Sequence, residues 1–580
     1  MPSSLRKNSR ITNEPEGRIK SSYFLTISTW KFLTGLILFL EKSGDGMKKI
    51  IVIGLDGATW EVLIPLVKKN KLPVLKKLLK YSAYGSLEST IPPVTGPSWL
   101  SFATGKNPGK LGVYDFLNKE GIDLRLKPVF SRHYRGQSVW DYFSRKGYKV
   151  GVVTYPTLYP PYAINGFMIS GLAPIDGKIT YPEKLRGEID KVSGGFELVV
   201  DYHKPKYDNV ELFLRDLNRV TDKQFRVVLH LLKTKDWNLF IYVCSATDWI
   251  QHIMWKHIDK SHPQYDQRVS PKYAEEFEKF FQKIDGFLAK LMNFDANLLI
   301  VSDHGFGPQD QCFNLVKWLK NKGYLLRKKI KTELGVKVKS KLLQTSTFLV
   351  RLFKLRKFFP HTLAIRVRRG LLTSIADVID FDRSVAYCLG HTIPFGGIYI
   401  NSNIKNSDKY EKIKMKIISD LKRLSNDIGR PLKVTIYEPE KIYNGDKIHL
   451  APDVIFTIND WRCVILEKSF DRPLFEDKPY SNRHTGSHRL NGILLANGKD
   501  IKKGYKVEKA KIYDIASTIF HIFGLPIPKD MDGRVLMEIF EPDSEPAKRK
   551  PVYVDPSYYD KSEEDKLKSK IRELKLKGKI

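Results

Sequence analysis

Short apolar runs rich in β-branched residues, separated by helical patterns, constrain the fold of this 580-residue chain more than any other feature. Runs of this length and composition are typical of strands buried on both faces, as in parallel sheets. Because helical patterns such as residues 60–79 and 271–292 alternate with them, the sequence predicts an α/β fold, with a doubly wound, mostly parallel sheet flanked by helices. The runs occupy residues 49–55, 149–154, 239–244 and 296–302.

Three of these runs end close to aspartate and histidine residues. The first is followed by Asp56, the third by Asp248 and His252, and the fourth by Asp303 and His304. Carboxyl ends of parallel strands meet at one edge of a sheet, where ligands bind, and carboxylates and imidazoles bind divalent cations. On a helix, the four-residue spacing of Asp248 and His252 puts both side chains on one face. Taken singly, each of these residues is equally well explained as a turn residue, a helix cap or a surface pair.

Two further stretches carry side chains of the same chemistry. Thr95 lies in a proline-rich turn ahead of a predicted helix at 98–104, where backbone N–H groups favour anions. A metal-bound hydroxyl at that place suits a nucleophile, and a helix cap is the structural alternative. The stretch 483–489 holds two histidines, each of which suits a metal ligand, although a solvated basic loop is also consistent with it. Its polar residues include Arg483, His484, His488 and Arg489.

The charge balance favours contact with phosphate-rich partners. The chain has 98 Lys and Arg against 64 Asp and Glu, a formal net charge of +34. This excess suits a phosphorylated substrate or an anionic membrane surface, and nucleic acid is not specifically indicated. The four cysteines form no C-x-x-C pair, so we expect no disulfide framework and a cytoplasmic protein, at most peripheral to a membrane.

The sequence predicts a catalytic domain interrupted by an insertion. We expect residues 47–310 and 381–540 to form its two parts, 311–380 a basic helical cap and 541–580 a charged tail. Residues 322–370 hold fifteen Lys and Arg and one Glu, which suits either a solvated lid or an interfacial helix on an anionic membrane. Residues 1–46 are expected to be a leader, with translation starting at Met47; if they are genuine, the apolar run at 23–40 predicts a membrane anchor.

Six motifs in this order resemble the type I phosphodiesterase/nucleotide pyrophosphatase family of the alkaline phosphatase superfamily, over residues 47–540. Within that family the chain is most similar to a prokaryotic group of predicted phosphohydrolases and phosphomutases. The resemblance implies an alkaline-phosphatase-like fold. The motifs are GLDGATW, IPPVTGPSWLSFATGKNPGK, YPPYAINGFMISG, ATDWIQH, SDHGFGP and GSHRLNGILLANG.

The resemblance implies two divalent metal ions, usually zinc, with manganese as the alternative. Asp248, His252 and His488 would hold one ion, with His488 preferred over His484 because the family's G-x-H falls on residues 486–488. The other ion would be held by Asp56, Asp303, His304 and the oxygen of Thr95. Thr95 would attack phosphorus in line and form a phospho-threonine that water then hydrolyses. The implied substrates are phosphodiesters or pyrophosphates, on a small molecule or a lipid head group. Residues that we expect to contact such a substrate are Ser98, Arg483, His484 and Arg489.

The chain also departs from the family pattern. Ser98 stands where many members carry asparagine, and Leu111 stands where many carry histidine. The turn around Thr95 lacks the C/S-x-P-x-R pattern of sulfatases, and the related phosphoglycerate mutases use serine as nucleophile. The same residues would also serve a phosphotransferase, a phosphomutase or a phosphomonoesterase. A non-enzymatic protein that binds an anionic membrane or a polyanion through its basic segment is the remaining alternative.

Overall fold

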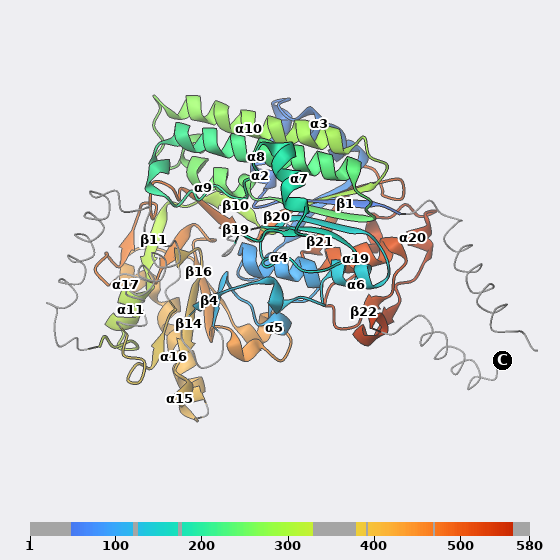
Figure 1. Cartoon of the computed structure of the whole chain (residues 1–580). Helices are drawn as coiled ribbons and strands as arrows, with labels where there is room; N and C mark the ends of the chain where they lie inside the picture. The colour runs from blue at the N-terminus through green and yellow to red at the C-terminus, as the bar shows by residue number, and fades with distance from the viewer. Residues whose placement is uncertain are drawn as a thin grey trace, which may run out of the picture. The chain divides into compact units, whose positions relative to one another are not determined.

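A computed structural model describes residues 48–119, 126–171, 177–328, 379–389, 392–405, 407–467 and 470–560. A nine-stranded sheet, in the order β21-β2-β20-β9-β1-β8-β5-β6-β7, organises the chain from residue 49 onward (Figure 1). Its central strands pair in parallel, β1 with β8 and β9, and β5 with β8. The four predicted runs form β1 (Ile50–Leu55), β5 (Val150–Tyr155), β8 (Leu239–Cys244) and β9 (Asn297–Val301).

Two strands of the sheet run against the parallel majority. β20 (Asn491–Asn497) lies between β9 and β2 (Ala83–Glu88) and is antiparallel to both. Beyond β6 (Gly166–Ser170), β7 (Thr180–Tyr181) is also antiparallel, while the opposite edge strand β21 (Tyr505–Lys511) is parallel to β2. The sheet is therefore mixed but mostly parallel, and the predicted α/β fold class is confirmed.

Helices cover both faces of the sheet. This is required because successive side chains of β1 point to opposite faces and all of them are buried. Ile51 and Ile53 belong to one core cluster, and Ile50 and Val52 to the other. The second cluster packs under α4 (Thr95–Thr104), α6 (Val139–Arg145) and α19 (Asp514–Phe523) (Figure 1). The first packs under α2 (Trp60–Lys68), α3 (Pro73–Tyr81), α7 (Leu185–Ser193), α8 (Val210–Thr234), α9 (Ala246–Ile258) and α10 (Ser270–Leu291).

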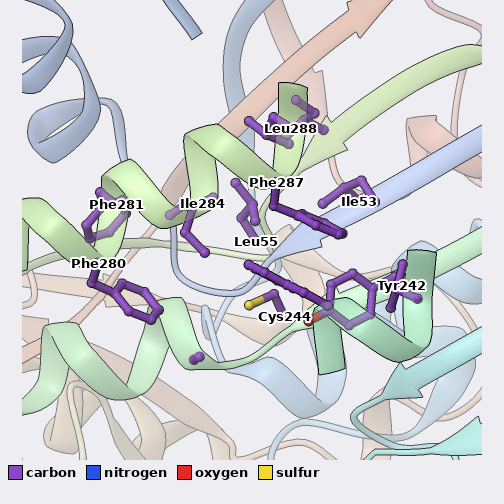
Figure 2. Close-up of a cluster of buried hydrophobic side chains, with 14 of the residues drawn as sticks. Ile53, Leu55, Tyr242, Cys244, Phe280, Phe281, Ile284, Phe287 and Leu288 are labelled. Atoms are coloured by element: carbon purple, nitrogen blue, oxygen red, sulfur yellow. The ribbon is translucent and has the colours of Figure 1, made fainter. Parts of the chain in front are cut away.

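The apolar face of α10 anchors the first core. Figure 2 shows Phe287 and Leu288 of this helix beside Ile53 of β1 and Tyr242 of β8. The ring of Phe287 is stacked on Phe225 of α8, with centroids 3.9 Å apart and planes at 7°. Burying one such aromatic side chain stabilises a fold by roughly 1.5–3 kcal/mol. The contacts of Phe287 therefore help to hold α10 against α8 and against the sheet.

Two helices differ from their predicted bounds. The helix expected at 60–79 is two helices, because Asn70 takes a left-handed conformation (φ 55°) and Pro73 starts α3. The helix expected at 98–104 begins at Thr95, because Pro97 falls in the first turn, where its missing N–H has no helical partner to lose.

Residues 311–328 and 379–467 share a separate core. It contains two four-stranded sheets and the helices α11 (Leu315–Asn321) and α16 (Lys409–Lys422). One sheet is formed by β13 (Thr392–Ile393), β17 (Cys463–Leu466), β11 (Gln311–Asn314) and β18 (Phe475–Glu476). The other is formed by β12 (Ala386–Tyr387), β14 (Gly396–Ile400), β16 (Val454–Ile458) and β15 (Val434–Tyr437).

Three predicted regions fall partly or wholly outside the described residues. Residues 1–46, residues 329–378 of the basic cap and residues 561–580 of the tail belong to this group. The leader, the helical cap and the membrane role of residues 322–370 therefore stay predictions. Of the tail, residues 545–548 form a short helix, and β23 (Tyr553–Val554) pairs with β22 (Ile527–Pro528). Among the helices that the structure describes, none is both long and apolar enough to cross a bilayer.

Candidate functional site

Five of the seven predicted ligands follow three neighbouring strands that end at one edge of the sheet. Asp56 directly follows β1, and Asp303 and His304 follow β9, whose partner in register is β1. On the other side of β1, β8 leads into α9, which carries Asp248 in its first turn. Carboxyl ends of adjacent parallel strands thus bring together side chains that are far apart in sequence.

The first group of side chains is Asp248, His252 and His488. Asp248 and His252 lie one turn apart on α9, with His252 Nε2 3.4 Å from Asp248 Oδ1. His488 comes from β19 (Gly486–Arg489), and its Nε2 lies 3.3 Å from Asp248 Oδ1 and 3.2 Å from His252 Nε2. These three ligand atoms converge on one point, and we call this group the α9 cluster.

The second group is Asp56, Asp303 and His304, which we call the β1 cluster. His304 Nε2 lies 3.3 Å from Asp303 Oδ2 and 3.7 Å from Asp56 Oδ1. The other oxygen of Asp303 accepts the backbone N–H of Gly57 at 3.1 Å, which fixes the carboxylate toward the cluster. The hydroxyl of Thr95, the first residue of α4, lies 3.3 Å from His304 Nε2. Thr95 therefore belongs to the same side of the site.

Backbone carbonyls orient all three imidazoles. Nδ1 of His252 lies 2.9 Å from the carbonyl of Gly486, Nδ1 of His488 3.0 Å from that of Pro93, and Nδ1 of His304 3.0 Å from that of Gly305. A carbonyl only accepts, so each Nδ1 carries a proton and donates it, and Nε2 of each ring faces its cluster.

Carboxylate oxygens face these imidazole nitrogens without a conventional hydrogen bond between them. Within the described residues, Asp56 Oδ1, Asp248 Oδ1 and Asp303 Oδ2 are buried and have no hydrogen-bond donor. Buried acceptors pointing at one another are unfavourable unless a cation lies between them. Two nitrogens with one carboxylate, and one nitrogen with two carboxylates, are donor sets that suit zinc or manganese. Both clusters thus fit a divalent ion.

Burial and like charge raise the pKa values of the β1 cluster. Burial, followed by the nearby carboxylates of Asp303 and Asp248, holds the pKa of Asp56 well above its usual range. Burial raises the pKa of Asp303 to about 7. Burial and the imidazole of His488, whose ring stacks on His304 at 3.8 Å, lower the pKa of His304. A bound cation offsets the cost of negative charge on the two carboxylates, and it binds the neutral form of imidazole that the low pKa of His304 favours.

A cavity of about 700 Å³ opens onto both clusters. Its lining includes Asp56 and Thr95 together with Asp248, His252 and His488. Its volume is that of a small-molecule site. Other lining residues are Val94, Asp115, Phe116, Val199, Val200, Asp201, Tyr202, His203, Lys204, Ser245, Trp249, Gln309, Pro394, Val464, Tyr480, His484, Gly486 and Ser487.

Of the four residues expected to contact substrate, only His484 lines this cavity. Ser98 is buried inside α4, with its hydroxyl 2.8 Å from those of Ser89 and Thr90. Arg483 forms an ion pair with Asp208 at 2.6 Å.

Arg489 is partly buried, and its guanidinium donates to backbone carbonyls, including those of Trp461 and His488 at 2.9 Å. Burial lowers the pKa of Arg489 to about 10. Its donors hold β19 in place, so they are not directed at the cavity.

The loop at residues 199–204, between α7 and α8, was not anticipated. Six consecutive residues of this loop line the cavity. The ring of Tyr202 stacks on His252 with centroids 5.2 Å apart and planes at 16°, and His203 stacks on His484 at 5.1 Å. No motif marks this loop, and the adjacent Tyr202 and His203 were its only chemical signal.

Comparisons with known proteins place the chain in a family. The model of the family described as type I phosphodiesterase/nucleotide pyrophosphatase matches residues 50–488. A search of curated proteins found no match.

Among solved structures, the chain is similar to an inactive variant of murine ectonucleotide pyrophosphatase/phosphodiesterase 5 in complex with AMP. The two sequences are 13% identical and the TM-score is 0.45. The alignment covers 85% of this chain and 100% of the murine chain. Phosphonoacetate hydrolase from Sinorhizobium meliloti 1021, in complex with phosphonoacetate, is 14% identical with a TM-score of 0.48, covering 81% of this chain and 94% of its own. The family match extends over most of the chain and includes every strand and helix that supplies the two clusters. The chain belongs to the type I phosphodiesterase/nucleotide pyrophosphatase family of phosphoric ester hydrolases.

Proposed function

We propose that this chain is a two-metal hydrolase of phosphodiester or pyrophosphate bonds on small molecules, with Thr95 as its nucleophile. One observation carries the proposal: the hydroxyl of Thr95 lies 3.3 Å from His304 in the β1 cluster, and the α9 cluster lines the same cavity. A nucleophile beside one three-ligand group and facing a second is the arrangement that an in-line phosphoryl transfer requires.

The residues that would hold the ions are those of the two clusters. The α9 cluster offers two imidazole nitrogens and a carboxylate, and the β1 cluster offers two carboxylates and an imidazole, with the Thr95 oxygen beside it. Divalent ions bound there, zinc or manganese, supply Lewis-acid stabilisation of the attacking and leaving oxygens.

The protein itself positions the nucleophile and receives the phosphate charge. Thr95 is the first residue of α4, so the free N–H groups of that helix's first turn lie beside its hydroxyl and favour a bound phosphoryl group. As the bond from Thr95 Oγ1 to phosphorus forms, the bond to the leaving group breaks, and the hydroxyl proton passes to solvent. The phosphorus on Thr95 keeps the substrate's remaining ester group. Water then cleaves the bond between Thr95 Oγ1 and phosphorus, releases that group as a phosphomonoester and restores the hydroxyl.

Hydrolysis of bis-p-nitrophenyl phosphate tests the proposal. Protein stripped with EDTA should be inactive and regain activity with Zn²⁺ or Mn²⁺. Thr95→Ala should reduce activity by about 10³-fold or more, as loss of a nucleophile does, and mass spectrometry of quenched wild type should find one p-nitrophenylphosphoryl group on the peptide with Thr95. Thr104→Ala is the matched control, because Thr104 ends the same helix and its hydroxyl bonds to the carbonyl of Leu100 and the N–H of Lys106, neither of which belongs to the clusters. Full activity in Thr95→Ala would refute the nucleophile assignment.

A further inference from the structure

Helix α9 carries a second pair of polar side chains beside the pair that belongs to the α9 cluster. Thr247 and Gln251 each precede a member of that cluster, Asp248 and His252, by one residue. Both pairs have the four-residue spacing that puts two side chains on one face of a helix, and a step of one residue turns about 100° around the helix axis. Thr247 and Gln251 therefore lie on the face next to that of the cluster. Both are fully buried, so neither touches a substrate in the cavity.

This second pair donates to the turn that follows β1. The hydroxyl of Thr247 donates to the backbone carbonyl of Asp56 at 2.7 Å, and it also lies 2.9 Å from the carbonyl of Cys244. The side-chain amide nitrogen of Gln251 donates to the carbonyls of Gly57 and Thr247, both at 2.8 Å. Carbonyl oxygens only accept, so the nitrogen is the end of this amide that faces them. Two successive carbonyls of the turn are thus held by α9.

The peptide group between Asp56 and Gly57 connects α9 to the β1 cluster. Its carbonyl accepts the hydroxyl of Thr247, and its N–H donates to Oδ1 of Asp303 at 3.1 Å. A trans peptide group is planar, with its C=O and N–H pointing in opposite directions. One rigid unit therefore makes both hydrogen bonds, and a displacement of Thr247 changes the position of that unit and of the Asp303 carboxylate that it holds.

The α9 cluster is held together by other bonds. The N–H of Thr485 donates to the carbonyl of His252 at 2.7 Å, and Nδ1 of His252 donates to the carbonyl of Gly486 at 2.9 Å. Both bonds attach α9 to the segment that carries His488. Loss of the bonds to the turn after β1 would therefore leave the three members of the α9 cluster together and would change their distance from the β1 cluster.

We propose that Thr247 and Gln251 are positioning residues, which set the separation between the α9 cluster and the β1 cluster, and so between the two ions that these clusters would hold. The inference rests on the proposed function, because it assigns an ion to each cluster. In two-metal sites, ions about 3.5–4 Å apart stabilise the attacking and the leaving oxygen together. A misplacement of about 1 Å can lower a rate by about 100-fold, so this separation controls the rate without a contact to substrate.

Substitutions of similar volume remove the two donors. Thr247→Val replaces the hydroxyl by a methyl group, and Thr247→Ser keeps a hydroxyl at the same place. Gln251→Met removes the amide and keeps the length of the side chain. Because cations repel each other, a loosened α9 should move its ion away from the other ion.

Helix α8 supplies a matched control for each donor. Thr221 is buried, and its hydroxyl donates to the carbonyl of Leu217 at 2.8 Å. Gln224 is also buried, and its amide nitrogen donates to the carbonyls of residues 197 and 198 at 3.2 and 2.9 Å. Thr221→Val and Gln224→Met therefore remove the same groups from a helix that carries no member of either cluster.

The measurement is the electron paramagnetic resonance spectrum of the full chain loaded with Mn²⁺, with elemental analysis of bound manganese and circular dichroism to verify folding. The dipolar coupling of two Mn²⁺ ions falls with the cube of their separation. We expect Thr247→Val and Gln251→Met to bind two ions per chain with a dipolar coupling lowered by about a third or more, which corresponds to an increase from about 4 Å to about 4.6 Å. Thr247→Ser and both controls should have the wild-type coupling.

Kinetics give a second readout. With both ions bound, kcat for bis-p-nitrophenyl phosphate should fall by about 10- to 100-fold in Thr247→Val and Gln251→Met, whereas KM should stay close to that of wild type. Wild-type coupling in both variants would overturn the inference. Loss of an ion would also overturn it, because the residue would then hold one site together. If neither variant folds, their hydrogen bonds serve the fold itself and the inference is wrong; one folded variant is sufficient for the test.

The outcomes also separate this inference from the proposed function. A wild-type chain that binds fewer than two manganese ions, or binds two that are not coupled, refutes the two-metal site itself. A wild type with two coupled ions, together with unchanged coupling in Thr247→Val and Gln251→Met, refutes only the role of these two residues.

Discussion

Replacing Gly57 with alanine should destabilise the protein by more than the backbone conformation alone explains. Gly57 follows Asp56 at the end of β1 and has a φ of +65°, in the left-handed region that favours glycine. A Cβ at this position would lie 2.9 Å from Phe306 and 3.3 Å from His304. Phe306 is fully buried and its ring packs on His252 at 4.8 Å, so it has no space into which to withdraw.

The expected cost has two parts. Placing a side chain in the left-handed region costs about 1–2 kcal/mol, part of which alanine recovers through a less flexible unfolded chain. Overpacking a filled core costs about a further 1–3 kcal/mol. We therefore expect Gly57→Ala to lower the free energy of unfolding by about 2–4 kcal/mol.

Gly194→Ala isolates the first part. Gly194 has a φ of +69° at the end of α7, and a Cβ there would meet nothing within 4 Å. Urea unfolding of both variants in EDTA removes any contribution from bound metal. Gly194→Ala should cost about 1 kcal/mol. Equal costs in the two variants would refute the steric argument and the close packing of Phe306 against the clusters.

Three further predictions concern charge at and around the site. Asp248→Asn should reduce bound zinc from two ions per chain to one, measured by elemental analysis after dialysis, and retention of both would contradict the α9 cluster. Arg489→Met should lower the melting temperature, because it leaves buried carbonyls without donors, whereas Arg483→Met should not, since that ion pair is exposed. Burial lowers the pKa of His257 from 6.5 to about 4, so the unfolded chain binds this proton first as pH falls. The free energy of unfolding should therefore be highest above pH 6.5 and decrease by at most about 3 kcal/mol as the pH falls toward 4. In His257→Asn, the free energy of unfolding measured by urea denaturation should depend less on pH between 6.5 and 4. An unchanged pH dependence would contradict the attribution of this effect to His257.

The sequence predicts the centre of the fold better than its periphery. Continuous β-branched runs can be buried on both faces only inside a sheet, so β1, β5, β8 and β9 were recognisable, and so was the edge where Asp56, Asp248 and Asp303 would meet. Strand direction leaves no such trace in composition, because β20 is as apolar as its neighbours and yet runs antiparallel.

Side-chain direction was the second limit. Arg489 and His488 are adjacent, and in a strand such neighbours point to opposite faces, so only one of them reaches the cavity. The loop at 199–204 illustrates a third limit. It reaches the α9 cluster only because α7 and α8 pack together beneath it, and no local pattern records a contact made over about fifty residues.

The position of β20 in the sheet has a consequence for the making of the protein. β2 pairs only with β20 and β21 among the described strands, and both of these lie beyond residue 490, while His488 precedes β20 by three residues. A growing chain on the ribosome therefore leaves β2 and the edge of β9 that pairs with β20 without their partners until the residues beyond 490 are synthesised. The site is completed by the same event that closes the sheet, so a chain released early has neither a finished sheet nor a complete α9 cluster.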